Sequence, residues 1–145
     1  MRAHINVNWW AILVSAIVLF LFGWLWYDLL FGKLWLAEIT RTNGAGATGQ
    51  MMSASPLYLF SVDFITAFFL AYGLALILKW RGPVGPLEGA WIGFAFGLLL
   101  FGTTTWLDYA YSGWGITLGF INVGYAAVGM AIQSAILAAW RPRAA

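Results

Sequence analysis

The sequence predicts an all-α membrane protein, a bundle of four transmembrane helices. Hydrophobic residues make up 63% of the chain and charged residues 8%, whereas about a quarter of the residues in soluble domains are charged. Four apolar runs are each long enough to cross a hydrocarbon core of about 30 Å, because a helix rises about 1.5 Å per residue. Since 145 residues leave no room for a separate soluble module, we expect one integral membrane domain over residues 1–145.

The first span is predicted over residues 9–30. Its apolar run is too long for the core of a signal peptide, and no small-x-small cleavage site follows it, which favours a membrane helix. The residues after it, FGKLWLAEI, suggest a short interfacial helix with Trp35, Leu36 and Ile39 toward the lipid. Residues 42–50 have the Gly-rich composition of a flexible loop.

The other three spans are predicted over residues 57–78, 89–107 and 117–139. Before the second span, Ser55 is expected to cap the helix and Pro56 to occupy its first position. The connection KWRGPVGPLE contains two Pro and two Gly and predicts a tight turn without helix.

The distribution of basic residues predicts the orientation. The N-terminus, second connection and C-terminus must share one side, and the first and third connections share the other. The first side carries five basic residues and the second carries two: Arg2, Lys79, Arg81, Arg141 and Arg143 against Lys33 and Arg41. The positive-inside rule therefore places both termini in the cytoplasm, and we expect a multi-pass membrane protein.

Similar tripeptides end alternate spans. Trp26-Tyr27-Asp28 resembles Trp106-Leu107-Asp108, and Lys79-Trp80-Arg81 resembles Ala139-Trp140-Arg141. One interpretation is two helical hairpins in tandem, related by a two-fold axis along the membrane normal. The alternative is that Trp and basic residues gather at membrane borders in any bundle, and an aromatic belt explains most of the ten Trp in the same way.

Asp63 is the sharpest candidate functional residue, because carboxylates inside spans are rare and mark ion or proton pathways. The alternative is structural anchoring, since Asp63 is near a helix N-terminus, where the macrodipole favours negative charge, and a partner such as Lys33 is available.

Other polar residues are expected in the same, extracytoplasmic half of the bundle. Carboxylates held close together there would meet the electrostatic requirement of a proton relay, whereas the alternative leaves Asp28 and Asp108 in water at the interface. The predicted polar vestibule consists of Asp28, Lys33, Asp63, Asp108, Asn122 and Tyr125.

Gly89, Gly93 and Gly97 recur every fourth residue in the third span. Residues four apart share one helix face, so these glycines predict close packing against another helix. The pattern leaves open whether that helix belongs to this chain or to a partner.

The composition argues against several classes of chemistry. There is no Cys, and the only His is His4, outside the spans, so we expect no disulfide, no metal site and no cofactor. A net charge of +2 is too small and dispersed for nucleic acid. No nucleophile–base pair is visible, so an enzyme is not predicted.

Two segments resemble the domain-of-unknown-function 1761 family of small bacterial membrane proteins. One is Asn8-Trp9-x-Ala11, followed by Gly23 and Trp26-Tyr27-x-x-Leu30-Phe31-Gly32-Lys33-x-Trp35; the other is Ile121-Asn122-x-Gly124-Tyr125. The chain departs from that family where Ser-Pro often follows the Trp-Tyr pair, because Asp28-Leu29 stands here. The resemblance implies a four-span fold in a bacterial inner (plasma) membrane and no known reaction or substrate.

Three functions remain open. The favoured one is an accessory or structural subunit that forms a homo-oligomer or joins a larger complex in the lipid bilayer. The alternative is a small proton- or solute-coupled transporter that uses Asp63 in the extracytoplasmic vestibule. An enzyme acting on lipids has the least support, because no catalytic constellation is visible.

Overall fold

The computed structural model describes residues 7–140, without the side chains of residues 43–53. Arg2, His4, Arg141 and Arg143 lie outside the described residues. The described chain is helical and contains no strand. Four helical segments are long and apolar enough to cross a membrane, which confirms the predicted four-helix bundle: Trp9–Leu30, Pro56–Arg81, Pro86–Ser112 and Ile116–Ala139.

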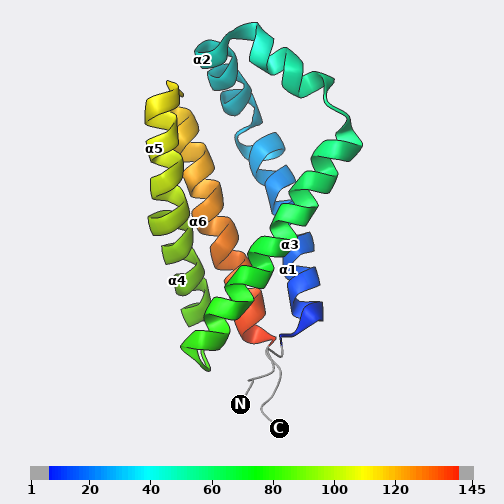
Figure 1. The fold of residues 1–145 in the computed structure, drawn as a ribbon, viewed down its shortest axis with the longest axis vertical. Coiled ribbons are helices and arrows are strands. Elements are labelled where there is room, and N and C mark those ends of the chain that lie inside the picture. Colours follow the sequence, from blue (N-terminus) through cyan, green and yellow to red (C-terminus); the bar gives the residue numbers. More distant parts are fainter. Residues whose placement is uncertain (1–6, 141–145) are drawn as a thin grey trace.

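The first span consists of α1 (Trp9–Trp24) and a wider π-helical segment, η1 (Leu25–Leu30). The Asn8 side chain caps α1 by accepting hydrogen bonds from the backbone N–H groups of Trp10 and Ala11. The same side chain donates to the carbonyl oxygen of Trp140 at 2.8 Å. The described ends of the chain therefore meet at one end of the bundle (Figure 1).

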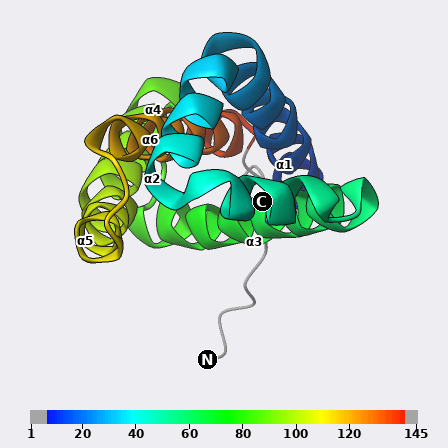
Figure 2. The same cartoon turned by 90° about the horizontal axis from the view of Figure 1, so that it is seen from above.

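After η1 the chain turns into α2 (Gly32–Ser53), which arches over the other end of the bundle toward α3 (Figures 1 and 2). The predicted flexible loop over residues 42–50 is wrong, because α2 continues through it. The low helix propensity of Gly is a weak preference of about 1 kcal/mol per residue, which does not by itself end a helix.

The second span is α3 (Pro56–Arg81). Pro56 occupies the first helical position as predicted, whereas Ser55 makes no side-chain capping bond. The turn that follows is shorter than expected, because α3 continues to Arg81 and the next helix begins at Pro86. Gly82 adopts a φ of 93°, and an ion pair of 2.8 Å joins Arg81 to Glu88 across the turn.

The third span is longer than predicted at both ends and comprises α4 (Pro86–Phe96), η2 (Gly97–Gly102) and α5 (Thr103–Ser112). It leads through Gly113 to α6 (Ile116–Ala139). In α6, 44% of the residues in the most apolar stretch are buried. In the corresponding stretch of the third span, only 17% are buried. The last helix is thus the centre of the bundle.

Three glycines bring the third span against α6. A Cβ atom at Gly89 would lie 2.7 Å from the carbonyl oxygen of Ser134, and one at Gly97 would lie 2.6 Å from that of Ala126. Gly93 faces the carbonyl oxygen of Met130 in the same way. Because the obstructing atoms are backbone atoms, this glycine face is occupied by another helix of the same chain.

The packing of α3 differs from that of the third span. α3 packs on α1 and α6, but it has no contact of similar extent with α4 or α5 within the described residues. It crosses the bundle diagonally and diverges from α5 toward the end covered by α2 (Figure 1). The contacts are therefore not repeated symmetrically, and the arrangement as two duplicated hairpins stays a prediction.

Candidate functional site

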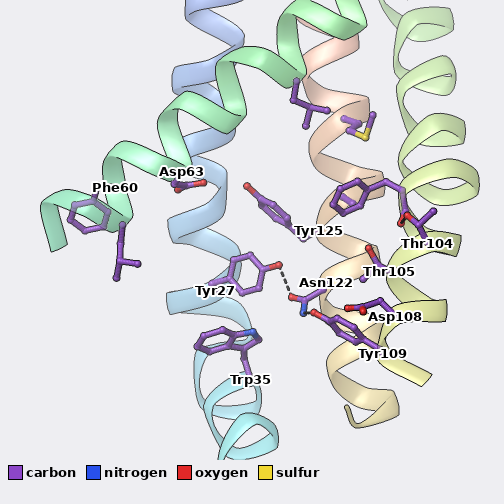
Figure 3. Close-up of a pocket in the computed structure, with 15 residues that line it drawn as sticks. Tyr27, Trp35, Phe60, Asp63, Thr104, Thr105, Asp108, Tyr109, Asn122 and Tyr125 are labelled. Atoms are coloured by element: carbon purple, nitrogen blue, oxygen red, sulfur yellow. Dashed lines mark hydrogen bonds between the residues drawn. The ribbon is translucent and has the colours of Figure 1, made fainter. Parts of the chain in front are cut away.

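The divergence of α3 from the α5–α6 pair leaves a cavity of about 950 Å³ in one half of the bundle. The first turns and the middle of α3, the second half of the third span, α6 and the η1–α2 junction contribute its walls (Figure 3). Its polar and aromatic lining residues are Tyr27, Trp35, Phe60, Asp63, Phe101, Thr104, Thr105, Asp108, Tyr109, Asn122 and Tyr125.

A chain of hydrogen bonds crosses one wall of the cavity. The Tyr27 hydroxyl donates to Asn122 Oδ1 at 2.6 Å, and Asn122 Nδ2 donates to the Tyr109 hydroxyl oxygen at 2.6 Å (Figure 3). Both tyrosine rings are thus held by one amide, because its carbonyl accepts and its NH2 donates. The Tyr109 hydroxyl keeps its own proton for a further partner.

The position of Tyr27 depends on its neighbour Trp26 in η1. The Trp26 indole N–H donates to the carbonyl oxygen of Ile121 at 3.0 Å. Its ring lies against Gly124, where a Cβ atom would approach the indole to 3.1 Å. Trp26 therefore attaches η1 to α6 and places Tyr27 opposite Asn122. π-Helical segments inside helices occur frequently at functional sites.

Aromatic rings complete this wall. The Tyr125 ring stacks on Phe22 with centroids 5.6 Å apart and meets the Tyr27 ring at 4.9 Å. Its hydroxyl lies against Gly23, where a Cβ atom would approach to 3.1 Å. Trp35, from the first turns of α2, packs edge-on against Tyr27 at 5.8 Å.

Asp63 enters the cavity from the opposite wall, about two turns into α3. It is half-buried and points toward Tyr125 (Figure 3). Its carboxylate makes no ion pair or hydrogen bond with any side chain that the structure describes. The expected alternative of a bond to Lys33 is therefore not present.

Asp108 lies on the α5 wall with Thr104 and Thr105. It is exposed and accepts a long hydrogen bond of 3.4 Å from Ser112. The Thr104 hydroxyl donates to backbone carbonyl oxygens of the preceding turn, at 2.9 Å to Phe101 and 3.1 Å to Leu100. Figure 3 shows the two carboxylates on different walls, with Asn122 and the tyrosines between them.

Four of the six residues predicted for the vestibule line this cavity: Asp63, Asp108, Asn122 and Tyr125. Asp28 and Lys33 do not line it, and both are exposed. The η1 segment presents Tyr27 to α6, so the next residue, Asp28, cannot share that direction.

Sequence reasoning misplaced two aromatic or apolar residues of α2. Trp35 was expected toward the lipid but lines the cavity, and Ile39 was expected there but is buried. Leu36 is exposed, as expected of a residue toward the lipid. The signal that was available for Trp35 is its short distance in sequence from Tyr27 across the Phe31-Gly32 turn, since Gly32 lets the chain fold back against the Tyr27 carbonyl oxygen.

The donor set favours hydrogen bonding and charge over metal chemistry. Within the described residues, no group of three or more His, Cys, Asp or Glu side chains is placed to hold a metal ion. The cavity instead combines hydroxyls, one amide, two carboxylates and aromatic faces. Such a set can bind and orient a small molecule.

The two segments that resemble a known family meet at this wall. Trp26 contacts Ile121 and Gly124, and Tyr27 contacts Asn122 and Tyr125. Comparison with protein families gives a match over residues 10–138 to the family described as protein of unknown function (DUF1761). No curated protein and no solved structure matches the chain. Because the match covers most of its length, the chain belongs to the DUF1761 family of proteins of unknown function.

Proposed function

We propose that this protein is a small transporter whose solute binds in the cavity between α3 and the α5–α6 pair. The observation that carries the proposal is an unpaired carboxylate, Asp63, facing a fixed hydrogen-bond chain across a cavity of about 950 Å³. Binding sites for small molecules are typically cavities of about 300–1,000 Å³ with a few placed polar groups. An intramembrane acid without a partner is by default a functional group.

The proposal includes a location. By the positive-inside rule the termini are cytoplasmic, in a bacterial inner membrane, and the cavity then lies in the extracytoplasmic half. What supports this is that Tyr27 and Trp35, which line the cavity, lie where η1 leads into α2. Figure 1 shows α2 at the end of the bundle opposite to the described chain ends, where Asn8 contacts Trp140. The solute would then enter from outside the cell.

The accessory-subunit hypothesis has lost one of its arguments. Gly89, Gly93 and Gly97 favoured a tight helix contact, and α6 of the same chain occupies that face. Assembly into a homo-oligomer or a larger complex remains a proposal with less support than transport. Its test is purification from the native membrane in mild detergent, where a stoichiometric partner supports it and a monomer contradicts it.

Cysteine accessibility tests the transport proposal directly, because the chain has no native Cys. Thr105 lines the cavity and has nearly the size of Cys, so Thr105→Cys reports on it. Leu99→Cys is the matched control, since Leu99 belongs to the same span, does not line the cavity and is exposed on an apolar surface. Each variant is reconstituted into liposomes and treated with a membrane-impermeant maleimide on one side at a time.

A transporter opens its site to both sides in turn. We therefore expect Thr105→Cys to react from the extracytoplasmic side and, more slowly, from the cytoplasmic side, while Leu99→Cys reacts from neither. Reaction from one side only would contradict transport and leave a binding protein. Absence of reaction from both sides would contradict a water-accessible site altogether.

A further inference from the structure

The charge of the cavity is entirely negative. Among the residues that the structure describes, its lining includes Asp63 and Asp108 and no Lys, Arg or His. Of the basic residues that the structure describes, Arg41 is paired with Glu38 at 2.7 Å and Arg81 with Glu88 at 2.8 Å. A carboxylate at membrane depth is costly without a countercharge, so this cavity favours a positively charged occupant.

The size and donor set of the cavity separate an organic cation from a metal ion. Hard metal ions require about six or more oxygen ligands at short distance, whereas the two carboxylates stand on different walls (Figure 3) and no metal-binding group occurs among the described residues. A volume of about 950 Å³ also exceeds that of an ion by far. It suits a molecule of many atoms.

Aromatic side chains next to Asp63 supply the recognition that an organic cation uses. Tyr27 and Tyr125 pack with centroids 4.9 Å apart, and Trp35 packs on Tyr27. Phe60 belongs to the same wall as Asp63. The faces of aromatic rings attract ammonium groups that have lost their water, and the hydrogen bond to Asn122 holds the Tyr27 ring in place.

Part of the exposed lining of the cavity is apolar and stands beside the exposed polar residues Thr104 and Asp108. Leu59 and Phe60 on α3 and Phe101 on η2 line the cavity and are 40%, 61% and 52% exposed. All three lie in helical segments that are long and apolar enough to cross a membrane. An occupant can therefore place an apolar group against these side chains while its charge lies beside Asp63.

We propose that the solute is an organic cation with an apolar group, bound with its ammonium centre between the Asp63 carboxylate and the rings of Tyr27 and Tyr125. This inference rests on the proposed solute-binding function and names its substrate class. Asp63 supplies the countercharge, and the rings exclude water from the cation.

Two probes of the same shape test it: benzyltrimethylammonium, which is a cation, and neopentylbenzene, in which carbon replaces the nitrogen. The readout is the rate at which N-ethylmaleimide, a neutral reagent, labels Thr105→Cys in nanodiscs. At saturation we expect the cation to slow labelling about fivefold or more, and neopentylbenzene to change it less than about twofold, because only the cation gains a charge-assisted contact.

Variants of the acid locate the charge. In the Thr105→Cys background, Asp63→Asn is expected to weaken protection by the cation about tenfold, because the neutral amide no longer attracts the quaternary ammonium charge. Asp63→Glu keeps the charge and retains protection. Asp28→Asn is the matched control, because Asp28 is exposed and outside the cavity, and it also retains protection.

The outcomes separate this inference from the proposed function. Equal protection by both probes, or none by the cation, overturns the cationic class while a labelled Thr105→Cys still supports a water-accessible cavity. If the cation still slows the labelling of Thr105→Cys fully in the Asp63→Asn variant, the proposed role of Asp63 as countercharge is overturned. If Thr105→Cys reacts with no reagent from either side, the proposed function itself fails.

Discussion

Single side chains from the two ends of the chain build the cavity wall. Tyr27 and Trp26 come from the first span, and Asn122 and Tyr125 come from the last. The Asn122 amide joins Tyr27 to Tyr109, and each of its two hydrogen bonds fixes the orientation of one tyrosine ring. The sequence pattern could place these residues in one half of the membrane, but not say which of them touch.

The hydrogen bond from Tyr27 to Asn122 predicts a modest stability effect. Tyr27→Phe leaves the amide carbonyl of Asn122 without its donor, and we expect a loss of about 0.5–1.5 kcal/mol, the usual range for side-chain hydrogen bonds inside membranes. Thermal unfolding in detergent measures it. Tyr111→Phe serves as control, because Tyr111 is 88% exposed; equal stability of the two variants would show that the bond does not hold the wall together.

Asp63 predicts opposite effects on stability and on binding. A half-buried carboxylate without a partner destabilises the protein when no solute is bound. Asp63→Asn should therefore raise the free energy of unfolding by about 0.5–2 kcal/mol, the common range for single stabilising substitutions. The midpoint of thermal unfolding without added solute is the measurement. If the substitution lowers stability instead, Asp63 is a structural anchor, which is the alternative that the sequence left open.

At the level of helices, close backbone contact between the third span and α6 allows α3 to diverge. Gly97 has the backbone of Ala126 and Ala127 against it, whereas a Cβ atom at Gly73, within α3, would meet nothing within 4 Å. The third span and α6 are thus in close backbone contact. On the opposite wall of the cavity, α3 has open space at Gly73.

Two Gly→Ala substitutions test this difference. Gly97→Ala should destabilise the protein by about 1–3 kcal/mol, because extra methyl groups in closely packed interiors force backbone shifts. Gly73→Ala should be neutral or stabilise by up to about 1 kcal/mol, since Ala is the better helix former. Unfolding midpoints of both variants check this, and a tolerated Gly97→Ala would contradict the packing of α6 on this face.

The helices also show where sequence reasoning reaches its limit. Hydropathy locates spans well because the cost of burying polar backbone groups in lipid depends on local composition. The Gly-rich composition of residues 42–50 mispredicted a loop, because composition reflects helix propensity, which is only a weak preference. The π-helical geometry of η1 and η2 has no comparable signal in composition, and η1 decides that Tyr27 rather than Asp28 faces α6.

For the whole molecule, the side from which a solute reaches the cavity depends on how the bundle lies in the membrane. The four spans and four of the lining residues of the cavity were predictable from the sequence. The open shape of the cavity was not, because it depends on the angle at which α3 diverges from α5 (Figure 1). That angle is set by contacts between distant residues. No local pattern encodes it.

The proposed orientation is tested by reporter fusions. Green fluorescent protein fused after Ala145 should fluoresce, and alkaline phosphatase fused there should be inactive, because the first folds in the cytoplasm and the second outside it. Reporters inserted at Gly113, in the turn before α6, should give the reverse pattern. The opposite result at both positions would place the cavity in the cytoplasmic half and contradict the positive-inside assignment.

The most direct test of the central claim is an experimental density map of the protein purified from its native membrane. We expect density that is not protein in the cavity, in contact with the Asp63 carboxylate and the rings of Tyr27 and Tyr125. A map in which α3 closes onto α5, or in which Asp63 forms an ion pair with a basic residue of this chain, would contradict it.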